Sequence, residues 1–99
     1  MSEEKVGCRT PAEGRDGVTN IPAWKYALLE RLIREVVAEA GEAGLPFSQL
    51  RAAVAARLSE EEAARLGSVG WHATCVKLEM EVRGDLRRLP GSPQRIVVR

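Results

Sequence analysis

The chain has 99 residues, a length that suits a single domain with a modest hydrophobic core. Its 15 basic and 14 acidic side chains leave a formal net charge of +1, so overall charge does not favour a nucleic-acid partner. Two cysteines do not make a disulfide framework, and we recognise neither a signal peptide nor an apolar run long enough to cross a membrane, so we expect a cytoplasmic protein with no membrane partner.

Residues 1–20 are rich in glycine, proline and charge and show no apolar periodicity, which predicts an irregular N-terminal arm. Residues 21–99 are predicted to form the folded domain. Its first helix is expected from about Ile21 to Ala40, because apolar residues recur on one side at helical spacing until Gly41 ends the pattern. The apolar stripe of this helix consists of Tyr26, Leu29, Ile33, Val36 and Val37, broadened by Trp24, Leu28 and Leu32.

The middle of the chain predicts a short strand and two shorter helices. Leu45–Phe47 is expected to supply an edge strand, and Phe47–Leu58 is expected to form the second helix of the domain. Ser59 and Glu62 then match a capping box, in which each side chain bonds the backbone amide of the other residue. A short helical turn is therefore predicted from this point to about Leu66.

The last third of the chain predicts a long helix that begins at the capping residue Ser68 and ends at Gly84. Four apolar side chains recur at spacings of 4, 3 and 4, which places them on one side of the helix. We expect this side to be buried. Its members are Trp71, Cys75, Leu78 and Val82.

A β-hairpin is predicted to close the chain. Leu86–Leu89 and Arg95–Arg99 are short runs suited to strands, and Pro90–Pro93 between them contains turn residues. A hairpin is marginally stable alone, so we expect it to pack on the helices and to pair with the edge strand. The order of elements predicts an α+β winged helix, with a three-helix core, a C-terminal β-hairpin wing and a short edge strand.

The chain resembles the winged helix-turn-helix superfamily, and most closely a small uncharacterised bacterial family of single-domain proteins with this layout. This resemblance implies the winged-helix fold and assigns no established activity. Most members of the superfamily bind DNA, and a minority are protein-interaction modules. The residues that carry the resemblance are Thr10-Pro11 with Gly14, Lys25-Tyr26, Val69-Gly70-Trp71, Val76-Lys77-Leu78, Glu81, Arg83-Gly84 and Ser92-Pro93-Gln94-Arg95.

One predicted function is binding of double-stranded DNA through the third helix and the wing. In a helix-turn-helix the outward residues of the second helix of the pair meet base edges in the major groove. Lys77 and Arg83 are the basic side chains opposite the predicted buried stripe, and the wing adds arginines suited to phosphate. The predicted nucleic-acid site consists of Lys77, Arg83, Arg87, Arg88, Gln94 and Arg95.

The alternative function is protein interaction or self-association without nucleic-acid binding. Arginines that alternate with apolar residues are also the ordinary solvent face of an amphipathic ribbon. If the predicted stripe is buried, Val76 and Met80 are exposed apolar residues, which suggests a contact patch that Trp24 could extend. The partner would be another protein or a second copy of this chain.

Catalysis is not expected. His72 is the sole histidine, and no paired acid and base, phosphate loop or nucleophile motif is recognisable. His72 and Cys75 lie three residues apart on one helix, but structural zinc needs four ligands. We therefore predict a small binding module with no metal, cofactor or small-molecule substrate.

Overall fold

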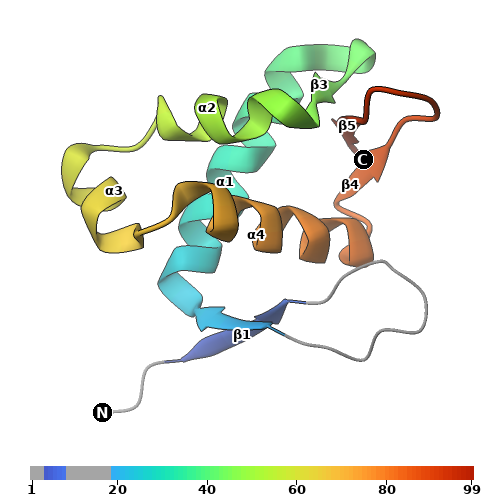
Figure 1. The fold of residues 1–99 in the computed structure, drawn as a ribbon. Helices are drawn as coiled ribbons and strands as arrows, with labels where there is room; N and C mark the ends of the chain where they lie inside the picture. Colours follow the sequence, from blue (N-terminus) through green and yellow to red (C-terminus); the bar gives the residue numbers. More distant parts are fainter. Residues whose placement is uncertain (1–3, 9–18) are drawn as a thin grey trace.

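The structure, a computed structural model, describes residues 4–8 and 19–99 and has an α+β fold (Figure 1). The α-helices in these residues are α1 (Ala23–Ala40), α2 (Leu50–Ala55), α3 (Glu60–Leu66) and α4 (Val69–Arg83). The strands in the same residues are β1 (Lys5–Cys8), β2 (Thr19–Pro22), β3 (Leu45–Pro46), β4 (Leu86–Arg88) and β5 (Arg95–Val98). Two short 3₁₀ helices, η1 (Gly41–Ala43) and η2 (Phe47–Gln49), flank β3.

The N-terminal segment differs from the predicted irregular arm. β1 and β2 pair antiparallel, with Val6 opposite Ile21, and the pair contacts α1 while β1 also contacts α4. Cys8 and Ile21 are buried in the core. Because Ile21 belongs to a strand, α1 begins two residues later than expected, at Ala23. Residues 1–3 and 9–18, which include the Thr10-Pro11 and Gly14 positions of the motif, lie outside the described residues.

Helix α1 is the central element of the core, and the prediction of its buried stripe is confirmed. The helix packs against α2, α4 and β5. It ends at Gly41, whose φ of 67° is readily adopted by glycine because it lacks a Cβ atom. The buried side chains of α1 are Tyr26, Leu29, Leu32, Ile33, Val36 and Val37.

The C-terminal sheet is antiparallel, with strand order β3-β5-β4, which confirms both the predicted hairpin and its edge strand. Leu45 lies opposite Ile96, and Leu86 lies opposite Val98. Leu45, Leu86 and Ile96 are buried in the main core cluster. The sheet therefore has the support from the helices that an isolated hairpin lacks.

Tyr26 introduces an unpaired polar atom into this core. Its hydroxyl is buried and finds no hydrogen-bond partner among the described residues, and burial raises the pKa of Tyr26 to about 12. A buried hydroxyl without a partner costs roughly 1–3 kcal/mol.

We therefore expect Tyr26→Phe to raise the free energy of unfolding by about 1 kcal/mol, measured by urea denaturation. Tyr26→Ala is the control for ring packing and should destabilise the domain. A loss of stability in Tyr26→Phe would show that the hydroxyl is bonded.

Candidate interaction surface

Helix α4 is rotated about its axis relative to the predicted orientation. Val76 and Met80, which we expected to be exposed, have no solvent exposure, and Ala73 beside them is also buried. This side of α4 faces α1 and α2. The predicted contact patch of Val76 and Met80 is therefore wrong, because both side chains belong to the hydrophobic core.

The opposite side of α4 carries the four apolar residues that we expected to be buried. Trp71 is 50% exposed and is the large apolar side chain that stands out as exposed within the described chain. Leu78 and Val82 are partly exposed, and Cys75 is partly exposed while also packing against the core. We call these residues, Trp71, Cys75, Leu78 and Val82, the α4 seam.

Lys77 is buried rather than free to meet a nucleic acid. It is 2% exposed, and its Nζ lies 3.1 Å from Glu81 Oε2 and donates a hydrogen bond of 2.6 Å to Gln94 Oε1. The same Nζ lies 4.5 Å from the centroid of the Phe47 ring. Burial lowers the pKa of Lys77, and its hydrogen bond to Glu81 opposes that shift. The predicted nucleic-acid roles of Lys77 and Gln94 are therefore corrected: the pair joins α4 to the C-terminal hairpin.

Two of the predicted basic residues also bind carboxylates of α4. Arg88 donates two hydrogen bonds to Glu81, and Arg83 Nε donates one of 2.7 Å to Glu79. These bonds raise the pKa of both arginines. Both side chains remain partly exposed, but their charges are already compensated, which weakens their predicted role in phosphate binding. The spacing of four residues between Lys77 and Glu81 is a signal that could have identified this network.

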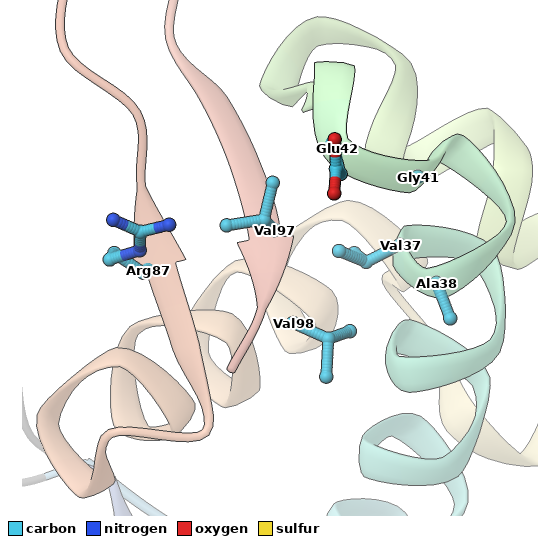
Figure 2. A pocket seen from close by; sticks show the side chains of 7 residues that line it. All are labelled: Val37, Ala38, Gly41, Glu42, Arg87, Val97 and Val98. Carbon is cyan, nitrogen blue, oxygen red and sulfur yellow. The ribbon is translucent and has the colours of Figure 1, made fainter.

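Arg87 and Arg95 are the predicted basic residues that make no ion pair with the described part of the chain. Arg87 is exposed on β4 and lies at the rim of a pocket of about 490 Å³ between the hairpin and the end of α1. Figure 2 shows Arg87 on one side of this pocket and Glu42 on the other, with Val97 between them. The remaining lining residues are Val37, Ala38, Gly41 and Val98. The pocket thus offers one cation and one anion around apolar side chains.

Trp24 does not extend an apolar patch. The guanidinium carbon of Arg65 lies 4.7 Å from the ring centroid, and Lys25 Nζ lies 5.6 Å from it. Lys25 also donates a hydrogen bond of 3.2 Å to the carbonyl oxygen of Leu66 at the end of α3. Trp24 is therefore covered by cations that connect α1 to α3, and its predicted role in an apolar contact patch is not supported.

The two thiols have little nucleophilic character. Both cysteines are free, and burial raises the pKa of Cys8 to about 11 and also raises the pKa of Cys75. His72 Nδ1 lies 2.7 Å from the carbonyl oxygen of Ser68, one turn earlier on the chain. Across the described ranges 4–8 and 19–99, no three histidine, cysteine, aspartate or glutamate residues lie together as a metal site.

A comparison with protein-family models identifies the family of this chain. A model described as Family of unknown function (DUF6958) matches residues 5–96. The chain belongs to this family. The α4 seam and the Lys77–Glu81–Gln94 network both lie inside the segment that matches DUF6958. Comparisons with curated proteins and with solved structures gave no match.

Every helix in the described residues is too short or too polar to cross a lipid bilayer.

Proposed function

We propose that this chain is a small non-catalytic domain of winged-helix type that acts as a protein-interaction module and self-associates through the α4 seam. The winged-helix assignment is supported by three packed helices, α1, α2 and α4, followed by a C-terminal hairpin whose second strand pairs with a short strand before α2. The resemblance of the sequence to that superfamily agrees with this order.

The observation that carries the interaction proposal is the exposure of the α4 seam. Spacings of 4, 3 and 4 are those of the a and d positions of a coiled coil, where side chains of one helix fit between those of another. A half-exposed tryptophan at one end of such a row is typical of an interface hot spot. The seam runs along a helix of 15 residues, or about 22 Å, which is long enough for a helix–helix contact.

DNA binding is less well supported by the same helix. If α4 entered a major groove, its outward side chains would meet the base edges, which are recognised mainly by arginine, lysine, asparagine and glutamine. The α4 seam presents indole, thiol and aliphatic groups instead, and Lys77 is buried on another side. Arg87, which is exposed, and Arg95, which is half-buried, remain available, but two cations provide few phosphate contacts.

Sedimentation velocity tests self-association. We expect the protein to shift from monomer towards dimer as its concentration rises through the micromolar range. Trp71→Asp and Leu78→Asp should each raise the dissociation constant by about thirtyfold or more, because loss of a hot spot costs at least about 2 kcal/mol.

Ala27→Asp is the matched control, because Ala27 is an exposed residue on α1 outside the seam, and this variant should associate as the wild type does. A wild-type protein that stays monomeric throughout this range would overturn the proposal. A monomer that also binds a random-sequence duplex, with binding weakened by Arg87→Ala, would instead support the nucleic-acid function.

A further inference from the structure

We infer that the pocket between the end of α1 and the C-terminal hairpin binds a short apolar peptide, whose free carboxylate contacts Arg87 and whose free ammonium group contacts Glu42. Its volume of about 490 Å³ falls in the range of about 300–1,000 Å³ that is usual for small-ligand sites. The lining residues belong to α1, η1, β4 and β5. The inference therefore goes beyond self-association through the α4 seam and does not depend on it.

The floor of this pocket is apolar and is held in place by the fold. Val37 of α1 is buried in the main core cluster, Val97 of β5 is also buried, and Val98 packs against the same cluster. Because α1 packs against β5, these side chains are positioned before any ligand arrives, and binding does not have to order them. An apolar ligand that covers this floor removes its own surface and that of the valines from water.

Two charges of opposite sign stand at the sides of the apolar floor. Arg87 lies on one side and Glu42 on the other, with Val97 between them (Figure 2). Both side chains are exposed, and neither makes an ion pair or hydrogen bond with the described part of the chain. Each can therefore bind an opposite charge without first losing an internal contact. Single exposed charges are ordinary, but two opposite ones at the sides of one apolar pocket match a ligand with two charged ends.

The separation of the two charges favours a peptide over a free amino acid. An α-amino acid carries its ammonium and carboxylate groups on one carbon atom, so it suits one side of the pocket at a time. An extended dipeptide separates these groups by about 7 Å, since the chain advances about 3.3–3.6 Å per residue. Its apolar side chains can then cover Val97 and Val98, while the planar guanidinium of Arg87 matches the carboxylate with two parallel hydrogen bonds.

Such a ligand was not expected from the sequence, because no single motif contains the pocket. Its lining residues come from two distant segments, 37–42 and 87–98. These segments meet only when the hairpin packs on α1.

The experiment is a titration of the whole chain with leucyl-leucine, followed by ¹H–¹⁵N correlation NMR. We expect saturable shifts centred on Ala38, Gly41 and Val97, with a dissociation constant on the order of 0.1–1 mM, as is usual for a ligand of this size. The N-acetylated dipeptide lacks the ammonium group, and the dipeptide amide lacks the carboxylate. Each should bind about tenfold more weakly, because each loses one charged contact.

Variants of the two charged residues identify which end of the ligand each one binds. Arg87→Gln should weaken binding of leucyl-leucine about tenfold but should bind the dipeptide amide as the wild type does. Glu42→Gln should behave in the same way towards the N-acetylated dipeptide. The matched controls are Arg31→Gln on α1 and Glu61→Gln on α3, both exposed and outside the pocket lining, and they should leave binding unchanged.

Three results would overturn the inference. The first is the absence of saturable shifts with leucyl-leucine up to about 10 mM, well above the expected dissociation constant. The second is binding of free leucine as tightly as the dipeptide, which would exclude a two-ended contact. The third is a loss in Arg87→Gln that is equal for the dipeptide and its amide, since Arg87 would then not bind the carboxylate.

Discussion

Met80→Asp is expected to unfold the domain, whereas Leu78→Asp, two residues earlier on the same helix, is expected to leave it folded. Met80 has no solvent exposure and packs in the main core cluster. Truncating a buried methionine to alanine costs about 2–5 kcal/mol, and burying a carboxylate in its place costs more. A domain of this size has a free energy of unfolding of about 5–15 kcal/mol, so the destabilisation by Met80→Asp is comparable to the total stability of the domain.

Leu78→Asp is the matched control because it introduces the same carboxylate on the partly exposed side of α4. Its cost should stay near 1 kcal/mol or below, as for other surface substitutions. Far-ultraviolet circular dichroism and urea denaturation of the two purified variants measure the difference. The reverse result, with Met80→Asp folded and Leu78→Asp unfolded, would mean that α4 is turned by half a rotation about its axis.

The orientation of α4 could not be predicted from the sequence because this helix has apolar residues on two opposite sides. One side carries Val76 and Met80, and the other carries Trp71, Leu78 and Val82. Helical periodicity predicts the helix in either case and favours the side with the larger side chains. Burial is decided by neighbouring elements: small Ala73 and flexible Met80 allow close approach of α1 and α2, while the bulky Trp71 remains outside.

Most other elements follow from local signals that have one interpretation. The second helix is an exception in its bounds: it was expected at Phe47–Leu58, whereas α2 covers Leu50–Ala55 and follows the 3₁₀ helix η2. Helix α1 has a single apolar stripe, and its predicted end at Gly41 agrees with the structure. The capping box of Ser59 and Glu62 is present, and Ser68 caps α4 by accepting a hydrogen bond from the backbone amide of Trp71. The pairing of β1 with β2 was not predicted, because four-residue strands separated by ten residues leave too short an alternation to recognise.

The candidate site residues were harder to place because their partners are distant in the sequence. Lys77 was expected to face solvent, as most lysines do. Its burial depends on Gln94, which lies 17 residues later in the hairpin and becomes a neighbour when the hairpin folds back on α4. The folded hairpin also brings Arg88 to Glu81, so this arginine contributes to the internal structure. Spacing along one helix could suggest Lys77–Glu81 but not these two contacts.

Glu81→Ala is expected to lower the free energy of unfolding by about 3 kcal/mol or more, because it removes the carboxylate that compensates a buried lysine. The Glu81 side chain is 6% exposed and lies between Lys77, which is 2% exposed, and Arg88. Without it, Lys77 Nζ keeps Gln94 as its hydrogen-bond partner but has no counter-charge. Urea denaturation measures the loss, and Glu60→Ala on the exposed start of α3 is the control, which should change stability by less than about 0.5 kcal/mol.

Lys77→Met separates the effect of the unpaired charge from the loss of packing. This change removes the buried ammonium but keeps most of the volume of the side chain, and Glu81 retains Arg88 as its partner. Replacing a buried charge by an apolar group of similar size is often close to neutral, so we expect Lys77→Met to cost much less than Glu81→Ala. The combined variant should then be more stable than Glu81→Ala alone, since the uncompensated lysine is absent. If Glu81→Ala and Lys77→Met proved equally destabilising and their effects simply added, the two residues would not form a coupled buried pair.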